Sequence, residues 1–583
     1  MFVRSSGSRI TYGLTWLLAL TLPFEVIQPL FRFRWFELTN LELLVMATAL
    51  AWSGETVLRI LHSSLSAPTR EHPWLQTRWA MPAWSLLLVA AISASLAPAN
   101  QREAFKFVVR IATGLYAFLL ILYVTTSQYR VAGLLWAIAL GAGLSACLGL
   151  GEAVGWQALD TFLSLFKKAS TLVGGILRVS ATFQYATIAA MFFEMAAPLA
   201  LVLSVTAHHP WRRALALALA FLCTGGVVLT LTRAGIAALG IVYGLAFGLG
   251  WAYPHFHPLR WRAALTLLSL ALLIGGLAWR ITVFRTRLTT EDDLNWYNAT
   301  YKAPASLTLR AGDIITVTVE ARNIGRIPWQ ARGERSFALG YRWLSADGRQ
   351  VLGPSHIELS LPHDVAPGET IRLAAQVQAF VPPGEYRLSW GMLQRKVLWF
   401  RHRGVSEAET LVLVEPGVVT PMASPVPTPL NDEAPAAPPT IRRMELWQAA
   451  WRIWTERPLF GIGPDNFRHL YGRYLGLSRW DIRLHANNLY LELLADLGLA
   501  GLIVFGWLVV TAAMELMRTL RQAPDKPITL WAAGVGGSLL AFLIHGLLDY
   551  FLEFTSLSLL FWMSLGLIAV LGSLSHQKGS EMS

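Results

Sequence analysis

The sequence has 583 residues, of which 54% are hydrophobic and only 14% are charged, and its mean hydropathy is +0.46. A soluble protein carries about a quarter charged residues, so this composition excludes an ordinary soluble protein. The formal net charge of +12 does not indicate nucleic-acid binding, because Lys and Arg gather in short loops between apolar runs, as membrane orientation requires. The two cysteines, Cys147 and Cys223, lie inside apolar runs and predict neither a disulfide nor a metal framework.

Apolar runs of about 17–25 residues, long enough to cross a membrane, recur along most of the chain. The first is interpreted as an uncleaved span, because Pro23-Phe24-Glu25 follows it instead of a small-residue cleavage site. With both termini placed in the cytoplasm, more Lys and Arg fall in the cytoplasmic tails and loops than in the opposite loops, which favours this orientation. About twelve spans are predicted, near residues 10–30, 38–55, 79–98, 107–125, 131–153, 185–206, 213–231, 234–252, 263–282, 497–516, 528–547 and 555–574.

The segment between the ninth and tenth spans has a different composition. Within residues 296–416, Val317 and Val319 alternate with threonines, and Leu373, Ala375 and Val377 alternate with polar residues, which is typical of half-buried strands. Turn signals such as Asp347-Gly348 separate the runs. The pattern predicts an antiparallel β-sandwich of about seven strands. The string Asn323-x-Gly325, Trp329, Pro367-Gly368 and Pro383-Gly384-Glu385-Tyr386 resembles immunoglobulin-like modules of bacterial envelope proteins.

The predicted organisation therefore has five parts. They are nine transmembrane helices in 1–282, the β-sandwich in 296–416, a Pro-rich extended linker in 417–440, an amphipathic helix with motif-bearing loops in 441–488, and three transmembrane helices with a cytoplasmic tail in 489–583. The predicted fold class is a polytopic α-helical membrane protein of about twelve transmembrane helices with an inserted extracytoplasmic β-sandwich domain.

Polar groups at the ends of spans are candidates for function, because they are costly at membrane depth. Arg178 precedes the sixth span, Arg233 lies between the seventh and eighth, and Arg443 begins the segment after the linker. By parity, all three loops open on the non-cytoplasmic face. A guanidinium stays charged and matches phosphate oxygens with two donors, so these residues are predicted to hold a diphosphate, with snorkelling at the interface as the alternative. The stripe Arg102, Lys106 and Arg110 carries only a helical spacing and is interpreted as an orientation signal.

A block of motifs follows the linker. It contains Arg443…Trp447, then Pro458-Leu459-Phe460-Gly461-Ile462-Gly463, then His485-Ala486-Asn487-Asn488, and then Gly498-Leu499-Ala500-Gly501. Together with Arg178-x-x-x-Thr182-Phe183 and Thr232-Arg233-x-Gly235, this block resembles the bacterial O-antigen ligase and polymerase family. The resemblance covers about 130–260 and 440–575. One position departs from the family, because Asn487 stands where the family has its catalytic histidine, and His485 is the histidine that remains.

The resemblance implies a metal-independent glycosyltransferase without a cofactor, located in the cytoplasmic (inner) membrane with its large loop outside. Its donor would be a glycan on undecaprenyl diphosphate, and its acceptor a hydroxyl of a lipid core, a polysaccharide or a protein. His485, Asn487 and Asn488 are the expected catalytic residues, with His485 taking the proton and Asn487 orienting a hydroxyl. Arg178, Arg233 and Arg443 would bind the diphosphate. His545 and Asp549 are expected to share a helix face and support the site.

Two other classes of function remain open from the sequence. A polysaccharide transporter or flippase is compatible with many spans and intramembrane charges, although no internal repeat supports it. An envelope protein of the same family with altered catalysis, or one that binds through its sandwich, is the other alternative. The sandwich is also a candidate for binding glycan or positioning the acceptor, because it lies in the same outer loop as the motifs.

Overall fold

The computed structural model describes residues 3–32, 37–63, 78–290, 295–417, 428–429, 441–522 and 526–582. The chain divides into two compact units. The helical unit comprises Met1–Thr171, Arg178–Gly276 and Ile441–Ser583. The β-rich unit comprises Leu172–Leu177 and Leu277–Thr440.

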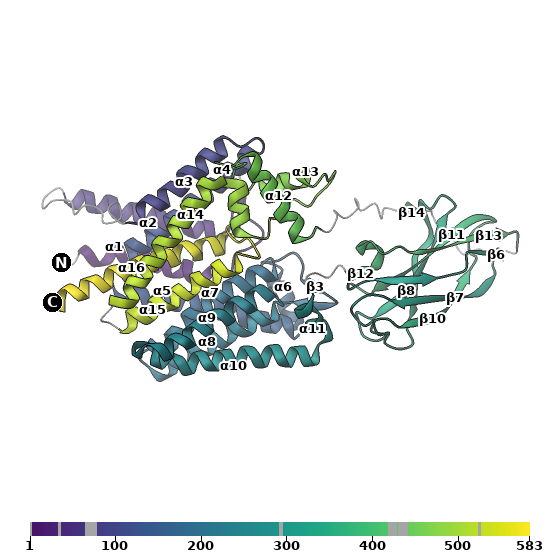
Figure 1. Cartoon of the computed structure of the whole chain (residues 1–583), viewed down its shortest axis with the longest axis horizontal. Coiled ribbons are helices and arrows are strands. Elements are labelled where there is room, and N and C mark those ends of the chain that lie inside the picture. The colour runs from purple at the N-terminus through teal and green to yellow at the C-terminus, as the bar shows by residue number, and fades with distance from the viewer. Residues whose placement is uncertain are drawn as a thin grey trace. The chain divides into compact units, whose positions relative to one another are not determined.

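A long helix overlaps every predicted span (Figure 1), although the first helix ends at Thr21 and not near residue 30 as predicted. Ten helices among the described residues are long and apolar enough to cross a membrane, and α1 and α3 are not among these ten. The chain is thus a polytopic helical protein with a separate β-rich region. The long helices are α1 (Val3–Thr21), α2 (Asn40–Ser63), α3 (Ala80–Ser95), α4 (Gln101–Val124), α5 (Gln128–Ala153), α7 (Ala186–Thr206), α8 (Pro210–Leu229), α9 (Arg233–Ala252), α10 (His257–Arg280), α14 (Leu489–Gln522), α15 (Lys526–His545) and α16 (Thr555–Met582).

The connections hold shorter elements. Two of them, α12 (Arg443–Glu456) and α13 (Phe467–Tyr474), pack on each other and against α14. The amphipathic α12 buries Leu446, Ala450 and Ile453 on one face, which is the helical spacing visible in the sequence. The remaining short elements are the hairpins β1 (Phe31–Arg32)–β2 (Glu37–Leu38) and β3 (Thr171–Val173)–β4 (Ile176–Arg178), with η1 (Gln157–Leu159), α6 (Asp160–Leu163), η2 (Pro254–Phe256) and α11 (Thr282–Thr289).

Helix α7 forms the core of the helical unit. It packs against α5, α8, α9 and α15, and almost all of its side chains are buried. A helix that is apolar all around is stable only when other helices cover it on every side. Its one acidic residue, Glu194, is completely buried, so it requires a partner, which His545 on α15 provides at 3.0 Å.

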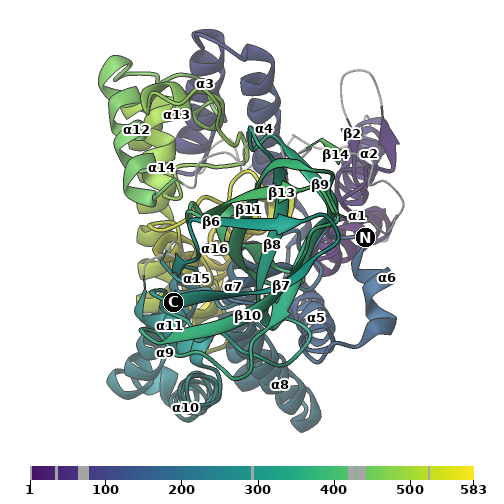
Figure 2. The ribbon, with the colours of Figure 1, turned by 90° about the vertical axis from the view of Figure 1, so that its right-hand side faces the viewer.

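Besides most of the β3–β4 hairpin, the β-rich unit contains two larger sheets. One has the order β10 (Thr370–Gln378), β7 (Ile314–Asn323), β5 (Ala299–Lys302). The other has the order β14 (Thr428–Pro429), β9 (Gln350–Ser360), β8 (Phe337–Ser345), β11 (Gly384–Gln394), β13 (Ala408–Glu415), β6 (Ser306–Arg310). The short strand β12 (Leu398–Trp399) pairs with β11 outside this order, and η3 (Phe400–Arg403) follows β12. Figure 2 looks onto this unit and shows β7 and β10 side by side.

The two sheets pack face to face. Tyr341 on β8 donates a hydrogen bond to the carbonyl of Gln376 on β10 at 2.7 Å, and Val317, Val319 and Leu373 are buried between the sheets. The alternation in the sequence thus sets which residues face inward. One strand pair differs from the expected antiparallel arrangement, because β6 and β13 run parallel. Almost the whole domain separates these two strands in the sequence, so no hairpin dictates their relative direction.

Three further expectations concern the boundaries of this region. The immunoglobulin-like classification of 296–416 stays a prediction. The Pro-rich linker predicted at 417–440 lies outside the described residues, apart from 417 and 428–429. The placement of the β-rich unit outside the membrane also stays a prediction.

Candidate functional site

The turn at 458–463 packs against a kink in α14. The kink lies at Gly498, whose φ of 67° and ψ of −168° break the helix. The backbone carbonyls and amides on either side of the kink lose their partners within the helix, and a buried backbone group needs another partner. The turn provides them through backbone hydrogen bonds of 2.8–3.1 Å, from Ile462 to Ala495, Gly463 to Asp496, Leu499 to Pro458 and Ala500 to Leu459.

Glycine is required at Gly498 for two reasons. Its φ lies in the region that side chains disfavour, and an added Cβ would lie inside contact distance of the Leu459 carbonyl. We expect Gly498→Ala to destabilise the protein by at least about 1–3 kcal/mol, measured as a lower midpoint of thermal unfolding in detergent. Gly506→Ala in the same helix is the matched control, because nothing lies within 4 Å of its added Cβ. Equal midpoints for the two variants would contradict the packing described.

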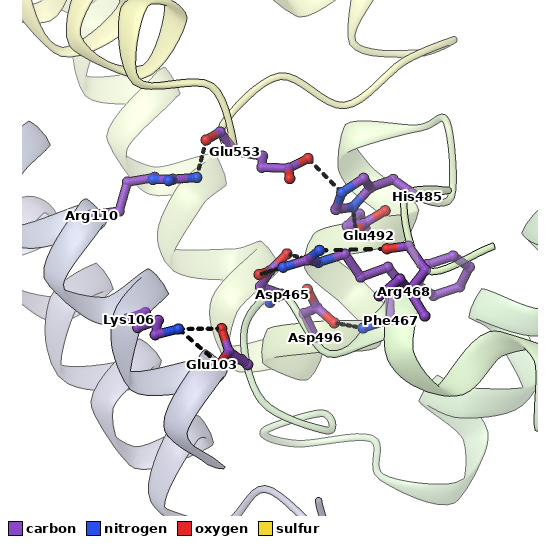
Figure 3. A network of polar contacts seen from close by, with 11 residues as sticks. Glu103, Lys106, Arg110, Asp465, Phe467, Arg468, His485, Glu492, Asp496 and Glu553 are labelled. Atoms are coloured by element: carbon purple, nitrogen blue, oxygen red, sulfur yellow. Dashed lines mark hydrogen bonds and ion pairs between the residues drawn. The ribbon is translucent and has the colours of Figure 1, made fainter. Parts of the chain in front are cut away.

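The carboxylate of Asp496, two residues before the kink, orders the loop that follows the turn. It accepts the amides of Asp465 at 2.7 Å and of Phe467 at 2.8 Å, at the start of α13. Asp465 in turn binds the guanidinium of Arg468 through both carboxylate oxygens, at 2.7 and 2.8 Å. This arrangement fixes Arg468 beside the histidine segment (Figure 3).

His485 lies between two carboxylates. Its Nδ1 is 2.5 Å from Oε1 of Glu492, in the first turn of α14, and its Nε2 is 2.6 Å from Oε2 of Glu553, in the loop between α15 and α16 (Figure 3). The second oxygen of Glu492 accepts the amide of Ala486 at 2.6 Å, which holds the Glu492 carboxylate beside the imidazole ring. Burial acts to lower the pKa of His485, but the two carboxylates outweigh it and raise the pKa well above its usual range. The imidazole is therefore protonated at neutral pH.

Glu553 is the more accessible partner in this pair, with its side chain 26% exposed against 7% for His485. The guanidinium of Arg110 on α4 donates to the Glu553 main-chain carbonyl, so α4 helps to hold this loop. Burial acts to raise the pKa of Glu553, but His485, Arg468 and Arg110 together lower the pKa to about 2. Glu553 is therefore a carboxylate throughout the physiological range.

A cavity of about 230 Å³ adjoins Glu553 and Arg110. Its wall comes from segments far apart in the sequence, namely the connection after α1, α4, the loop before α7 and the loop before α16. Most of its lining residues are polar or aromatic. They are Glu25, Thr39, Arg110, Phe166, Thr182, Phe183, Gln184, Glu553, Phe554, Thr555 and Ser556, with Val26, Ile27 and Ile188 completing the lining.

A buried ion pair holds the loop before α7. Glu152, at the end of α5, pairs with Lys167 and accepts the amides of Ser180 at 3.3 Å and Ala181 at 2.9 Å. Ala181 has a φ of 49°, and the loop turns there toward the cavity. Lys167 also donates to the Ser180 hydroxyl at 3.1 Å. Glu152 on α5 thus holds the loop that carries Thr182 and Phe183.

The structure brings two of the predicted diphosphate-binding arginines together. Arg178 donates from Nε to the carbonyl of Thr230 at 3.0 Å and from Nη2 to the hydroxyl of Thr232 at 3.1 Å. Thr232 directly precedes Arg233, the first residue of α9. Arg178 therefore braces the turn that presents Arg233, and both side chains are partly exposed.

Arg443 belongs to a neighbouring part of the same region. It begins α12 and lies close enough to His545 for its charge to act on that imidazole. His545 contacts Glu194, and Glu194 lies against Gly235, two residues after Arg233, where an added Cβ would collide with the carboxylate. Contacts thus connect His545 with the surroundings of Arg233, and the charge of Arg443 acts on the same imidazole.

The expected pairing of His545 with Asp549 on one helix face is wrong in its geometry. Helix α15 ends at His545, and Asp549 lies in the loop that follows. The Gly546 amide still donates to the carbonyl of Phe542 at 2.9 Å, and the Gly546 carbonyl accepts the amide of Leu489 at 2.7 Å. Asp549 still interacts electrostatically with His545, but the hydrogen-bond partner of that imidazole is Glu194.

The two asparagines of the motif occupy different environments. The Oδ1 of Asn488 accepts the amides of Tyr490 and Leu491, both at 3.0 Å, and its Nδ2 donates to the carbonyl of Leu547 at 2.9 Å. Asn488 therefore caps α14 and ties it to the loop after α15. Asn487 has a φ of 49° and is half-buried, and no hydrogen bond of its side chain to another described residue is present.

Sequence reasoning missed the carboxylates around His485. Glu492 follows it by seven residues at the start of a predicted span, and an acid at that depth was a usable signal. Glu553 is an acid between two spans and carried the same signal, but nothing local connects it with His485. Arg110 was interpreted as an orientation residue, whereas its guanidinium holds the Glu553 loop.

Residues 428–506 match the family described as O-antigen ligase. The matched region contains the turn, α13, His485, Glu492 and the kink of α14. No curated protein matches the chain.

Proposed function

Because the chain carries an O-antigen ligase family domain at residues 428–506, we propose that it is a glycosyltransferase acting on a lipid-linked glycan. The donor is a glycan on undecaprenyl diphosphate, and the acceptor is a hydroxyl of a lipid core, a polysaccharide or a protein. The reaction takes place at the outer face of the cytoplasmic membrane. The family domain within a polytopic helical chain is the observation that carries this proposal.

The arginines serve the donor. Arg178, Arg233 and Arg443 bind the diphosphate and stabilise the negative charge that develops on it as the anomeric bond breaks. The hydrogen bonds of Arg178 to the turn before Arg233 support this assignment, because they keep two guanidinium groups in one neighbourhood. His545, with Glu194 behind it and Asp549 nearby, supports the region of Arg443.

The histidine segment serves the acceptor. His485 acts together with its carboxylate partners, because both ring nitrogens already face a carboxylate oxygen. Asn487 is free to orient a hydroxyl of the acceptor, and Asn488 positions the segment. The proposed reaction uses no cofactor and no metal ion.

A transfer assay with purified protein tests the proposal. The labelled donor is a glycan on undecaprenyl diphosphate, and a lipid core, a polysaccharide and a protein with accessible hydroxyls are offered in turn as acceptors. We expect label to move to one acceptor class, with release of undecaprenyl diphosphate, in the presence of EDTA. Absence of a product with every acceptor would contradict the transferase assignment. Loss of the product in EDTA would contradict the metal-independent mechanism alone.

A further inference from the structure

The cavity beside Glu553 differs in its lining from the second cavity described in the helical unit. The other, of about 260 Å³, is lined almost wholly by apolar residues of α7, α9, α14, α15 and α16. The lining of the cavity beside Glu553 instead includes Thr39, Thr182, Ser556, Gln184 and Glu25, whose side chains carry hydroxyl, amide and carboxylate groups. This mixture of donors and acceptors matches a ligand that carries several hydroxyl groups.

The lining also offers apolar surfaces. The rings of Phe166, Phe183 and Phe554 border the same space. A sugar ring has C–H faces and a rim of hydroxyl groups, so aromatic surfaces interleaved with polar groups suit it. At about 230 Å³ the cavity is smaller than the roughly 300–1,000 Å³ of sites for drug-sized molecules. Its size is therefore that of one sugar unit, not of a long oligosaccharide.

Glu553, and not His485, is the member of the pair that reaches this cavity. Glu553 is part of the lining, whereas His485 is not. The ring of His485 is buried against Tyr550, at 5.0 Å between ring centroids, and each of its nitrogens faces a carboxylate. Of the two residues, Glu553 alone therefore borders the space open to a ligand hydroxyl.

We propose that this cavity binds the terminal sugar of the acceptor and that Glu553 takes the proton from its attacking hydroxyl. The inference rests on the proposed glycosyltransferase function. The hydroxyl oxygen forms a bond with the anomeric carbon of the donor, and the bond from that carbon to the diphosphate breaks with its electron pair on the diphosphate oxygen. The hydroxyl proton moves to the Glu553 carboxylate. His485 is a positioning residue that holds Glu553 in place and keeps it ionised.

A carboxylate with a low pKa can serve in this way. The hydroxyl becomes acidic only as its oxygen bonds to the anomeric carbon, so the base receives the proton late. The catalytic-loop aspartate of protein kinases accepts a hydroxyl proton during group transfer in a comparable manner. Positioning of the carboxylate then matters more than its basicity.

The charges around Glu553 define a pH test. Besides His485, it faces Arg110 from α4, Arg468 from α13 and Tyr550 from its own loop, with Glu492 behind His485 and Glu25 across the cavity. With His485 in place, Glu553 stays ionised far into the acid range. His485→Gln keeps a hydrogen-bonding side chain but removes the positive charge. The acid limb of the pH profile of kcat/KM for the acceptor should then move up by about 1–3 pH units.

The decisive experiment measures acceptor and donor kinetics separately. In wild type and Glu553→Gln, we expect donor affinity to agree within a few-fold, while kcat falls by about 10²–10⁴-fold. Glu553→Asp should recover part of the lost rate. Glu334→Gln, which breaks an exposed ion pair with Lys396 in the β-rich unit, is the control with unchanged kinetics. Midpoints of thermal unfolding identify any variant that fails to fold, and in that case Glu553→Asp and the His485→Gln profile decide.

The outcomes separate this inference from the proposed function. If wild type transfers glycan and Glu553→Gln keeps its kcat, the assignment of Glu553 is overturned while the transferase stands. A loss of kcat in Glu25→Gln without a loss in Glu553→Gln would likewise overturn it, in favour of the carboxylate across the cavity. An acid limb that does not move in His485→Gln would contradict the positioning by His485.

Discussion

Replacement of His485 with alanine is expected to lower the rate of glycan transfer by about 10²–10⁴-fold, the range that proton transfer contributes in enzymes. Without the imidazolium, the buried carboxylate of Glu492 loses its charged partner, and Glu553 loses the contact that holds it beside the cavity. The rate constant kcat should fall more than the affinity for the donor. Steady-state kinetics with the donor and the acceptor varied in turn measure both.

Stability must be separated from catalysis in this variant. Removal of one partner from a buried ion pair typically costs about 3–5 kcal/mol, so the unfolding midpoint of His485→Ala should also fall. His485→Gln, which can still hydrogen-bond, should unfold closer to wild type while remaining slow. His576→Ala, at an exposed position near the end of α16, is the matched control and should transfer normally. Full activity in a folded His485→Ala protein would remove His485 from the site.

Replacement of Arg233 with alanine should slow transfer by about 10²–10³-fold, the effect of removing one preorganised donor from a developing anion. Arg178→Ala should have an effect of similar size, because Arg178 braces the turn that presents Arg233. Lysine should rescue neither position fully, since an ammonium group cannot donate two parallel hydrogen bonds. Transfer rates with a saturating acceptor measure these losses.

The control for the arginines is Arg212→Ala. Arg212 lies near the other end of α8, where its guanidinium stacks on the exposed Trp211 at 5.1 Å, and it should be dispensable. The double variant Arg178→Ala/Arg233→Ala should lose less than the product of the two single losses, because neighbouring residues that act on one group are coupled. Wild-type transfer by Arg233→Ala would contradict the assignment of the diphosphate site.

Much of the architecture follows from the sequence alone. Span length and apolar composition predict where the long helices lie, because a membrane helix satisfies its own backbone and needs a fixed length. The alternation around Val317 and Leu373 predicts the inward faces of β7 and β10. The resemblance of the motif block to the O-antigen ligase family is confirmed for residues 428–506.

The partners of the site residues could not be predicted in the same way. Glu553 meets His485 only because the loop before α16 folds back beside the start of α14, and no local pattern encodes that contact. The same holds for Glu194 and His545, which meet across two packed helices. Arg110 sits on a regular basic stripe, where spacing cannot distinguish an orientation signal from a residue that holds a loop.

The end of a helix and a turn account for the remaining differences. A helical spacing placed His545 and Asp549 on one face, but α15 ends at His545. The segment around Asn487 is a second case. The positive φ of Asn487 and the capping of α14 by Asn488 show that this segment is a turn and not an extended strand. Residues two apart in a turn need not point the same way, so the relation of Asn487 to His485 required the structure.

The most direct test of the central claim is a reconstitution in vesicles that counts two products in one sample. Wild-type protein receives a glycan on undecaprenyl diphosphate together with the acceptor identified in the transfer assay. We expect each newly glycosylated acceptor hydroxyl to be matched by one freed undecaprenyl diphosphate. Movement of the intact lipid-linked glycan across the bilayer, with no new bond to the acceptor, would contradict it and identify a transporter instead.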